Sequence, residues 1–235
     1  MALTDGEGLV SVAFALDRRQ PVSEQVYEVL RQAIIRVQLP PGTPISENSL
    51  CRQFKVSRTP VRAAILRLSE EGLVDVYPQQ GSFVSAIKLS DVRDSHFVRR
   101  SLELALLREV AGRWTPAMSR EMRDVIATQA DDIRRGDVDA FHRDDERFHQ
   151  LLAVYAERAG VWGTILAAKT RLTRFIRFSG NAKRLPVVIT EHEAIVDALD
   201  RGDADAADDA LTLHLDRIFV LFEQRPERDR AYFTN

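Results

Sequence analysis

Apolar side chains recur at three- and four-residue spacing along most of this chain, which is the period of a helix with one buried face. The pattern predicts a first helix over residues 22–37. That helix ends before Pro40, because a proline excludes the residue before it from helical geometry. Two shorter helices are expected over residues 46–54 and 58–71, with a brief turn between them.

Two extended segments follow, over residues 73–77 and 82–86, and the turn residues between them predict a hairpin. The order helix, helix, turn, helix, hairpin is typical of a winged helix-turn-helix. No strand is expected after residue 90, where the period is helical throughout. The predicted fold class is therefore mainly α, with an N-terminal winged helix-turn-helix and a C-terminal all-α helical bundle. The expected bundle helices cover residues 90–113, 116–135, 137–157, 160–180, 185–201 and 203–224.

These patterns divide the chain into three parts. Residues 1–17 lack periodicity and are expected to form a flexible arm. Residues 18–87 are expected to form the winged helix-turn-helix domain, and residues 88–235 the helical domain. A length of 235 residues accommodates two domains of these sizes.

Composition indicates the cellular compartment in which the chain is expected to work. The chain has one cysteine, Cys51, so it cannot form an internal disulfide and a reducing compartment is expected. Its longest apolar runs fall short of the roughly 20 residues that a membrane span needs. The N-terminus has no basic region ahead of an apolar stretch, as a signal peptide would. We therefore expect a cytoplasmic protein without a membrane partner.

The net charge of −2 does not indicate a nucleic-acid partner, but local charge does. Between Ser46 and Arg67 there are five basic residues and one acid. Arg58 and Arg62 are four apart and share a helix face, and arginine presents a donor fork suited to guanine or phosphate. Ser57, at the expected N-cap of this helix, adds a hydroxyl. These residues alone leave open a capped surface helix with two ordinary arginines.

Three of the five histidines lie in suggestive contexts in the second region. Asp145 and His149 are four apart on one predicted helix, so both side chains project the same way among apolar neighbours. His192 follows Glu191 on a later helix, and His214 lies between leucines on the last one. Together they offer nitrogen and oxygen donors that divalent transition metals accept. Spacing in one sequence cannot show convergence, so three separate core histidines remain an alternative.

The first region resembles the DNA-binding domain of GntR-family regulators, because five short motifs occur in the expected order. The resemblance implies that Arg58 and Arg62 contact DNA, assisted by Ser57, Thr59 and the wing residue Gly81. Asn48 occupies a position where some relatives place a DNA-contacting arginine. The motifs are Pro41-Gly42-Thr43, Ile45-Ser46-Glu47-Asn48-Ser49-Leu50, Val56-Ser57-Arg58-Thr59-Pro60-Val61-Arg62, Leu68-Ser69-Glu70-Glu71-Gly72-Leu73-Val74 and Gly81-Ser82-Phe83-Val84.

The second region resembles the FCD-type ligand-binding domain of the FadR subfamily of GntR regulators. Members of this subfamily that bind a metal carry an Asp-x-x-x-His pair and two more histidines. This chain has a residue of the matching type at each of these four positions. The resemblance implies zinc as the metal, with nickel, manganese or iron as alternatives. It also implies an effector-binding arginine at Arg100, and Arg174 is a weaker candidate. The four candidates are Asp145, His149, His192 and His214.

The resulting hypothesis is a homodimeric DNA-binding transcription regulator, a repressor that recognises a palindromic operator in double-stranded DNA. A small organic acid bound at the divalent metal would control its operator affinity, because open coordination positions suit carboxylate oxygens. Two alternatives remain. One is a metal-dependent hydrolase, although we find no further acid or base at catalytic spacing, so an enzyme is not expected. The other is a regulator whose metal is purely structural.

Overall fold

A computed structural model describes residues 16–17, 19–179, 184–223 and 227–234, and the predicted arm lies almost entirely outside these residues. The chain forms two compact units. The first comprises the chain through Leu89 together with residues 173–178 and the C-terminal residues from Pro226, and the second comprises the remainder. The division differs from the expected boundaries in those two later segments, which join the N-terminal unit.

Three helices build the first unit: α1 (Val22–Ile35), α2 (Glu47–Phe54) and α3 (Arg58–Glu70). Ser46 caps α2 as expected, since its side chain accepts a hydrogen bond from the backbone N–H of Ser49. Apolar faces of all three helices meet in one core that also includes strand residues. Its fully buried members include Val26, Leu30, Ile34, Leu50, Val61 and Leu68.

The hairpin of this unit belongs to a three-stranded antiparallel sheet. Strands β2 (Val74–Tyr77) and β3 (Gly81–Val84) form the hairpin, and β1 (Pro44–Ile45) pairs with the other edge of β3. The sequence did not reveal β1, because two residues are too short for an alternating pattern. Gly81 begins β3 with φ of 112°, a conformation that glycine adopts without strain.

A second, two-stranded sheet contradicts the expectation that no strand follows residue 90. Strand β5 (Phe233–Thr234) pairs in parallel with β4 (Ile87–Lys88), and the short 3-10 helix η2 (Glu227–Tyr232) leads into it. The Phe233 ring packs against Phe175, with 5.8 Å between ring centroids. Pairing between segments so far apart in sequence leaves no local periodicity, so the earlier prediction was wrong here.

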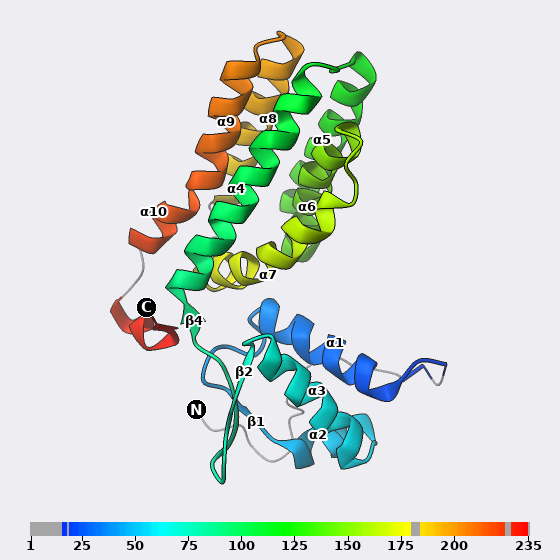
Figure 1. Ribbon diagram of the computed structural model, residues 1–235, viewed down its shortest axis with the longest axis vertical. Helices are drawn as coiled ribbons and strands as arrows, with labels where there is room; N and C mark the ends of the chain where they lie inside the picture. The colour runs from blue at the N-terminus through cyan, green and yellow to red at the C-terminus, as the bar shows by residue number, and fades with distance from the viewer. Residues whose placement is uncertain (1–15, 18, 180–183, 224–226, 235) are drawn as a thin grey trace. The chain divides into compact units, whose positions relative to one another are not determined.

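The second unit is an all-α bundle, and Figure 1 shows its long helices running side by side. The observed helices agree closely with the predicted ones except at the end of the chain. There the single helix expected over residues 203–224 breaks at Arg217 into two. The helices are α4 (Leu89–Ala111), α5 (Pro116–Arg135), α6 (Val138–Tyr155), α7 (Val161–Ser179), α8 (Leu185–Asp200), α9 (Ala204–Asp216) and α10 (Ile218–Glu223). Of these, the first residue of α4 and residues 173–178 of α7 belong to the first unit.

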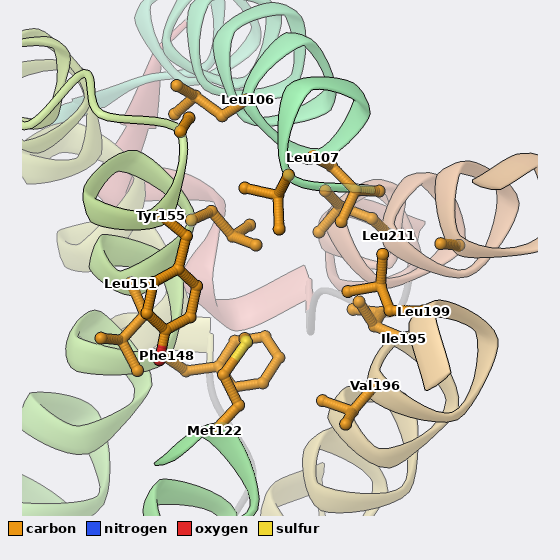
Figure 2. Close-up of a cluster of buried hydrophobic side chains, with 14 of the residues drawn as sticks. Leu106, Leu107, Met122, Phe148, Leu151, Tyr155, Ile195, Val196, Leu199 and Leu211 are labelled. Atoms are coloured by element: carbon orange, nitrogen blue, oxygen red, sulfur yellow. The ribbon is translucent and has the colours of Figure 1, made fainter. Parts of the chain in front are cut away.

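A continuous apolar core fills this bundle. Figure 2 shows side chains from opposite helices meeting in its centre, among them Phe148, Met122 and Ile195. The predicted fold class is confirmed: mainly α, with a winged helix-turn-helix followed by a helical bundle. Among the described residues, no helix combines the length and the hydropathy that crossing a membrane requires.

Two leucines on α3 test how far the first unit depends on its core. Leu68 is completely buried, whereas Leu66, two positions away, is 60% exposed. Leu68→Ala should lower the free energy of unfolding of this unit by about 2–5 kcal/mol, because it removes apolar contacts and leaves a cavity. Leu66→Ala should change it by less than about 1 kcal/mol. Hydrogen exchange of the α1 and α3 amides measures both, and equal protection in the two variants would contradict the packing described above.

Candidate metal centre and nucleic-acid interface

Four side chains from three helices converge inside the bundle. Asp145 and His149 lie one turn apart on α6, His192 comes from α8 and His214 from α9. One ligand atom from each lies within 4.8 Å of all the others. The three histidines are buried, and the Asp145 side chain is only 16% exposed. The structure thus brings together all four residues that the sequence singled out as metal ligands.

Each histidine ring is fixed through its Nδ1 atom. The Nδ1 of His192 lies 3.0 Å from the amide oxygen of Gln129, and that of His214 lies 2.9 Å from a carboxylate oxygen of Glu191. The Nδ1 of His149 lies 2.7 Å from Glu103. The partners of His192 and His214 are hydrogen-bond acceptors, which favours a proton on Nδ1 and directs Nε2 toward the cluster. The Nε2 of His149 faces the Arg99 guanidinium, from which it accepts a hydrogen bond.

The Nε2 atoms face one another, as metal donors do. Those of His149 and His214 are 3.2 Å apart, and two donors about 2.1 Å from one ion have roughly that separation. The Nε2 of His192 is buried without a hydrogen-bond partner among the described residues, 3.7 Å from Asp145 Oδ1. Buried nitrogens need a partner. A divalent ion fits this donor set.

Electrostatics keep the site ready for a cation. Burial lowers the pKa of His149 to about 4, although Glu103 opposes this shift, so the ring is neutral near pH 7. Burial likewise holds the pKa of His192 well below its ordinary value. Burial alone would raise the pKa of Asp145, but the Lys169 ammonium and the nearby histidines hold it well below the usual range. An ionised Asp145 and neutral rings at His149 and His192 are the forms that bind metal.

Two buried cations border the cluster, and sequence reasoning missed both. Arg99 on α4 places Nη2 2.9 Å from His149 Nε2 and pairs with Glu103 at 2.7 Å. Lys169 on α7 places Nζ 3.1 Å from Asp145. Arg99 and Glu103 are four apart on one helix, and Lys169 directly follows an apolar run. These are the signals that could have indicated buried charges.

The two arginines predicted to bind the effector lie elsewhere. Arg100 contacts Thr212 and Asp216, which occupy the side of α9 opposite His214. Its neighbour Arg99 faces the cluster instead, because adjacent helix positions point about 100° apart. Arg174 belongs to the N-terminal unit, where its guanidinium donates to the backbone carbonyl of Ser85.

The predicted DNA-contacting residues lie on α2, at the start of α3 and on the hairpin. All of them are exposed, and the side chain of Arg62 is 68% exposed. Arg58 donates to Asn48 Oδ1 at 3.0 Å, and Arg62 pairs with Glu47 at 3.0 Å, so both guanidiniums are oriented from α2. The exposed set is Asn48, Ser57, Arg58, Thr59, Arg62 and Gly81.

One detail of this surface differs from expectation. Ser57 occupies the N-cap position of α3, but its side chain makes no capping hydrogen bond. Its backbone is extended, with φ of −71° and ψ of 171°, and its side chain is exposed. The hydroxyl and the first N–H groups of α3 therefore remain available to an anionic ligand such as a phosphate.

Comparison with protein families gives a match for each part of the chain. The model described as bacterial regulatory proteins, gntR family, matches residues 22–84. The FCD domain model matches residues 94–217, which include the whole four-residue cluster. The two matches follow the division into a winged helix-turn-helix and a helical bundle.

Similar proteins extend this match over nearly the full length. The chain is 34% identical over 226 residues to the HTH-type transcriptional repressor RspR of Escherichia coli K12, covering 96% of this chain and 99% of that protein. It is 27% identical to a probable D-xylose utilization operon transcriptional repressor of Paenarthrobacter nicotinovorans, covering 84% of this chain and 87% of that one. Both are described as regulators rather than enzymes.

Solved structures share the fold. A putative GntR transcriptional regulator from Rhodococcus sp. RHA1 has a TM-score of 0.69 at 26% identity, covering 87% of this chain and 99% of that one. E. coli McbR/YncC has a TM-score of 0.65 at 20% identity, with the same coverage.

Proposed function

We propose a repressor controlled by an organic acid at a divalent metal, from the premise that this chain belongs to the gntR family of bacterial regulatory proteins and carries an FCD domain. The family membership predicted from the motifs is confirmed, and it makes the protein a transcription regulator rather than an enzyme. The metal and the effector go beyond that membership. The convergence of four donors in the bundle supports both.

The start of α3 is the part of the first unit suited to read DNA. In a helix-turn-helix the second helix enters the major groove, and residues at its N-terminus reach base edges. Arg58 and Arg62 occupy that position with exposed guanidiniums, while Val61 and Leu68 anchor the opposite face in the core. Gly81 places the wing for a backbone contact. A homodimer would present two such helices to a palindromic operator.

Replacing Arg58 tests this interface. Duplexes selected from a random library by the wild-type protein should show two-fold symmetry. Arg58→Ala should weaken binding to them by roughly 10- to 100-fold, because one guanine or phosphate contact is lost. Arg120→Ala is the matched control: it removes one exposed positive charge from α5. Electrophoretic mobility shift at fixed salt measures both, and equal affinities would exclude Arg58 from the interface.

The metal we propose is zinc, with nickel, manganese or iron as alternatives. Three imidazoles and one carboxylate are a donor set that zinc accepts, and each ring has a polar partner at Nδ1, as in established metal sites. The divalent ion with one anionic ligand carries a net charge of about +1. That charge, together with Arg99, makes the site attractive to an organic acid.

Removing His214 tests the metal. Wild-type protein dialysed against zinc should retain about one ion per chain, and His214→Ala should retain far less, because it loses one of four donors. His142→Ala is the control, since His142 contacts the Phe141 ring and is not one of the four cluster residues. Plasma mass spectrometry gives the metal content. Equal content in wild type and His214→Ala would remove His214 from the ligand set.

Thermal shift separates a sensor from a purely structural metal site. An acid that binds the folded, metal-loaded protein should stabilise it by about 2.7 kcal/mol at a concentration 100 times its Kd. The same acid should have no such effect after chelator treatment, and neither should its neutral amide. Arg99→Met should reduce the shift, because the guanidinium beside His149 is the arm we assign to the carboxylate. If no acid in a broad panel raises Tm, the metal is structural.

A further inference from the structure

Lys169 is a buried cation placed directly behind a metal-ligand candidate. Its side chain is 5% exposed, and its Nζ lies 3.1 Å from Asp145 Oδ2. The next carboxylate, Glu146, is 3.8 Å away and 38% exposed. Taking an ammonium out of water is unfavourable unless an anion compensates it. The shorter contact goes to the inner carboxylate, so the ammonium acts on the cluster itself.

The two carboxylate oxygens of Asp145 have different neighbours. Oδ2 faces Lys169, whereas Oδ1 faces His192 Nε2 at 3.7 Å and His149 Nε2 at 3.9 Å. A carboxylate can bind an ion through one oxygen or through both. With Oδ2 held by an ammonium, only Oδ1 is directed toward the histidine nitrogens.

We propose that Lys169 is a positioning residue that limits Asp145 to one oxygen at the metal, which reserves two coordination positions for an effector that chelates through two oxygens. Three imidazoles and one carboxylate oxygen would supply four donors, so a six-coordinate ion held by them would accept two more. If both oxygens of Asp145 bound, one position would remain. An α-hydroxy or α-keto acid supplies a carboxylate and an adjacent oxygen. This inference rests on the proposed function and adds the effector class to it.

The test compares two probe acids that differ by one hydroxyl. Cobalt(II) replaces zinc, because its visible absorption reports coordination number, and the probes are glycolate and acetate. Wild-type protein should bind glycolate about tenfold more tightly than acetate and change its cobalt spectrum accordingly. Lys169→Met keeps the side-chain length but removes the charge. It should retain cobalt, show the spectrum of one additional ligand and lose the preference for glycolate.

Two further variants test whether the charge of Lys169 causes the preference for glycolate. Lys169→Arg retains a cation and should restore the preference at least in part. Arg171→Met, on the same helix, removes an exposed cation that pairs with Asp91 and should leave the preference intact. If circular dichroism shows that the methionine variant does not fold, Lys169→Gln takes its place. A merely structural lysine would weaken both acids equally and leave the cobalt spectrum unchanged.

The outcomes distinguish this inference from the proposed function. A wild-type protein that binds cobalt and acids but shows no preference for glycolate overturns the role of Lys169 and leaves the sensor function standing. The same holds if Lys169→Met retains the preference. A wild-type protein that takes up no metal overturns the proposed function, and this inference with it.

Discussion

The helical unit depends on the compensation of charges buried in an otherwise apolar bundle. Glu103 is completely buried and is stable there because Arg99 and His149 contact its two oxygens. Asp145 is compensated in the same way by Lys169. Removing one partner of a buried pair leaves an uncompensated charge, which is strongly unfavourable. The polar cluster therefore specifies the mutual positions of α4, α6 and α7 more narrowly than apolar packing alone would.

The two units meet opposite requirements. In the helical unit, the three candidate histidine ligands are buried, and each has a polar neighbour at its Nδ1. In the winged helix-turn-helix unit, the candidate DNA-contacting side chains are exposed, and the opposite face of α3 is buried. Ion pairs with exposed partners, such as Arg62 with Glu47, are weak and exchange readily with a phosphate or a base. Such a surface can release the ion pair when DNA arrives, whereas the buried cluster must keep its geometry.

Much of the fold and part of the candidate site could be predicted from the sequence. The features that could not be predicted depend on contacts between distant segments. Helical periodicity located the bundle helices, and the four-residue spacing placed Asp145 and His149 on one face. The convergence of His192 and His214 with them followed only from the family resemblance, since spacing within one helix says nothing about another. The resemblance pointed to Arg100 for the effector, whereas the neighbouring Arg99 is the arginine that faces the cluster, because a motif does not fix which neighbour points to the interior. The partners of buried charges, such as Lys169, depend on tertiary contacts that no local pattern encodes.

Glu191 connects the four-residue cluster to the end of α9. One of its oxygens holds Nδ1 of His214, and the other lies 3.4 Å from Arg217, at the break between α9 and α10. Arg184 contacts the same carboxylate through both oxygens. If a metal bound at the cluster, a shift of the His214 ring would change the hydrogen bond to Glu191 and hence the charge environment of Arg217. An effector can shift an equilibrium only by its differential affinity for two arrangements, so the contacts that run from His214 through Glu191 to Arg217 are where such a difference would arise.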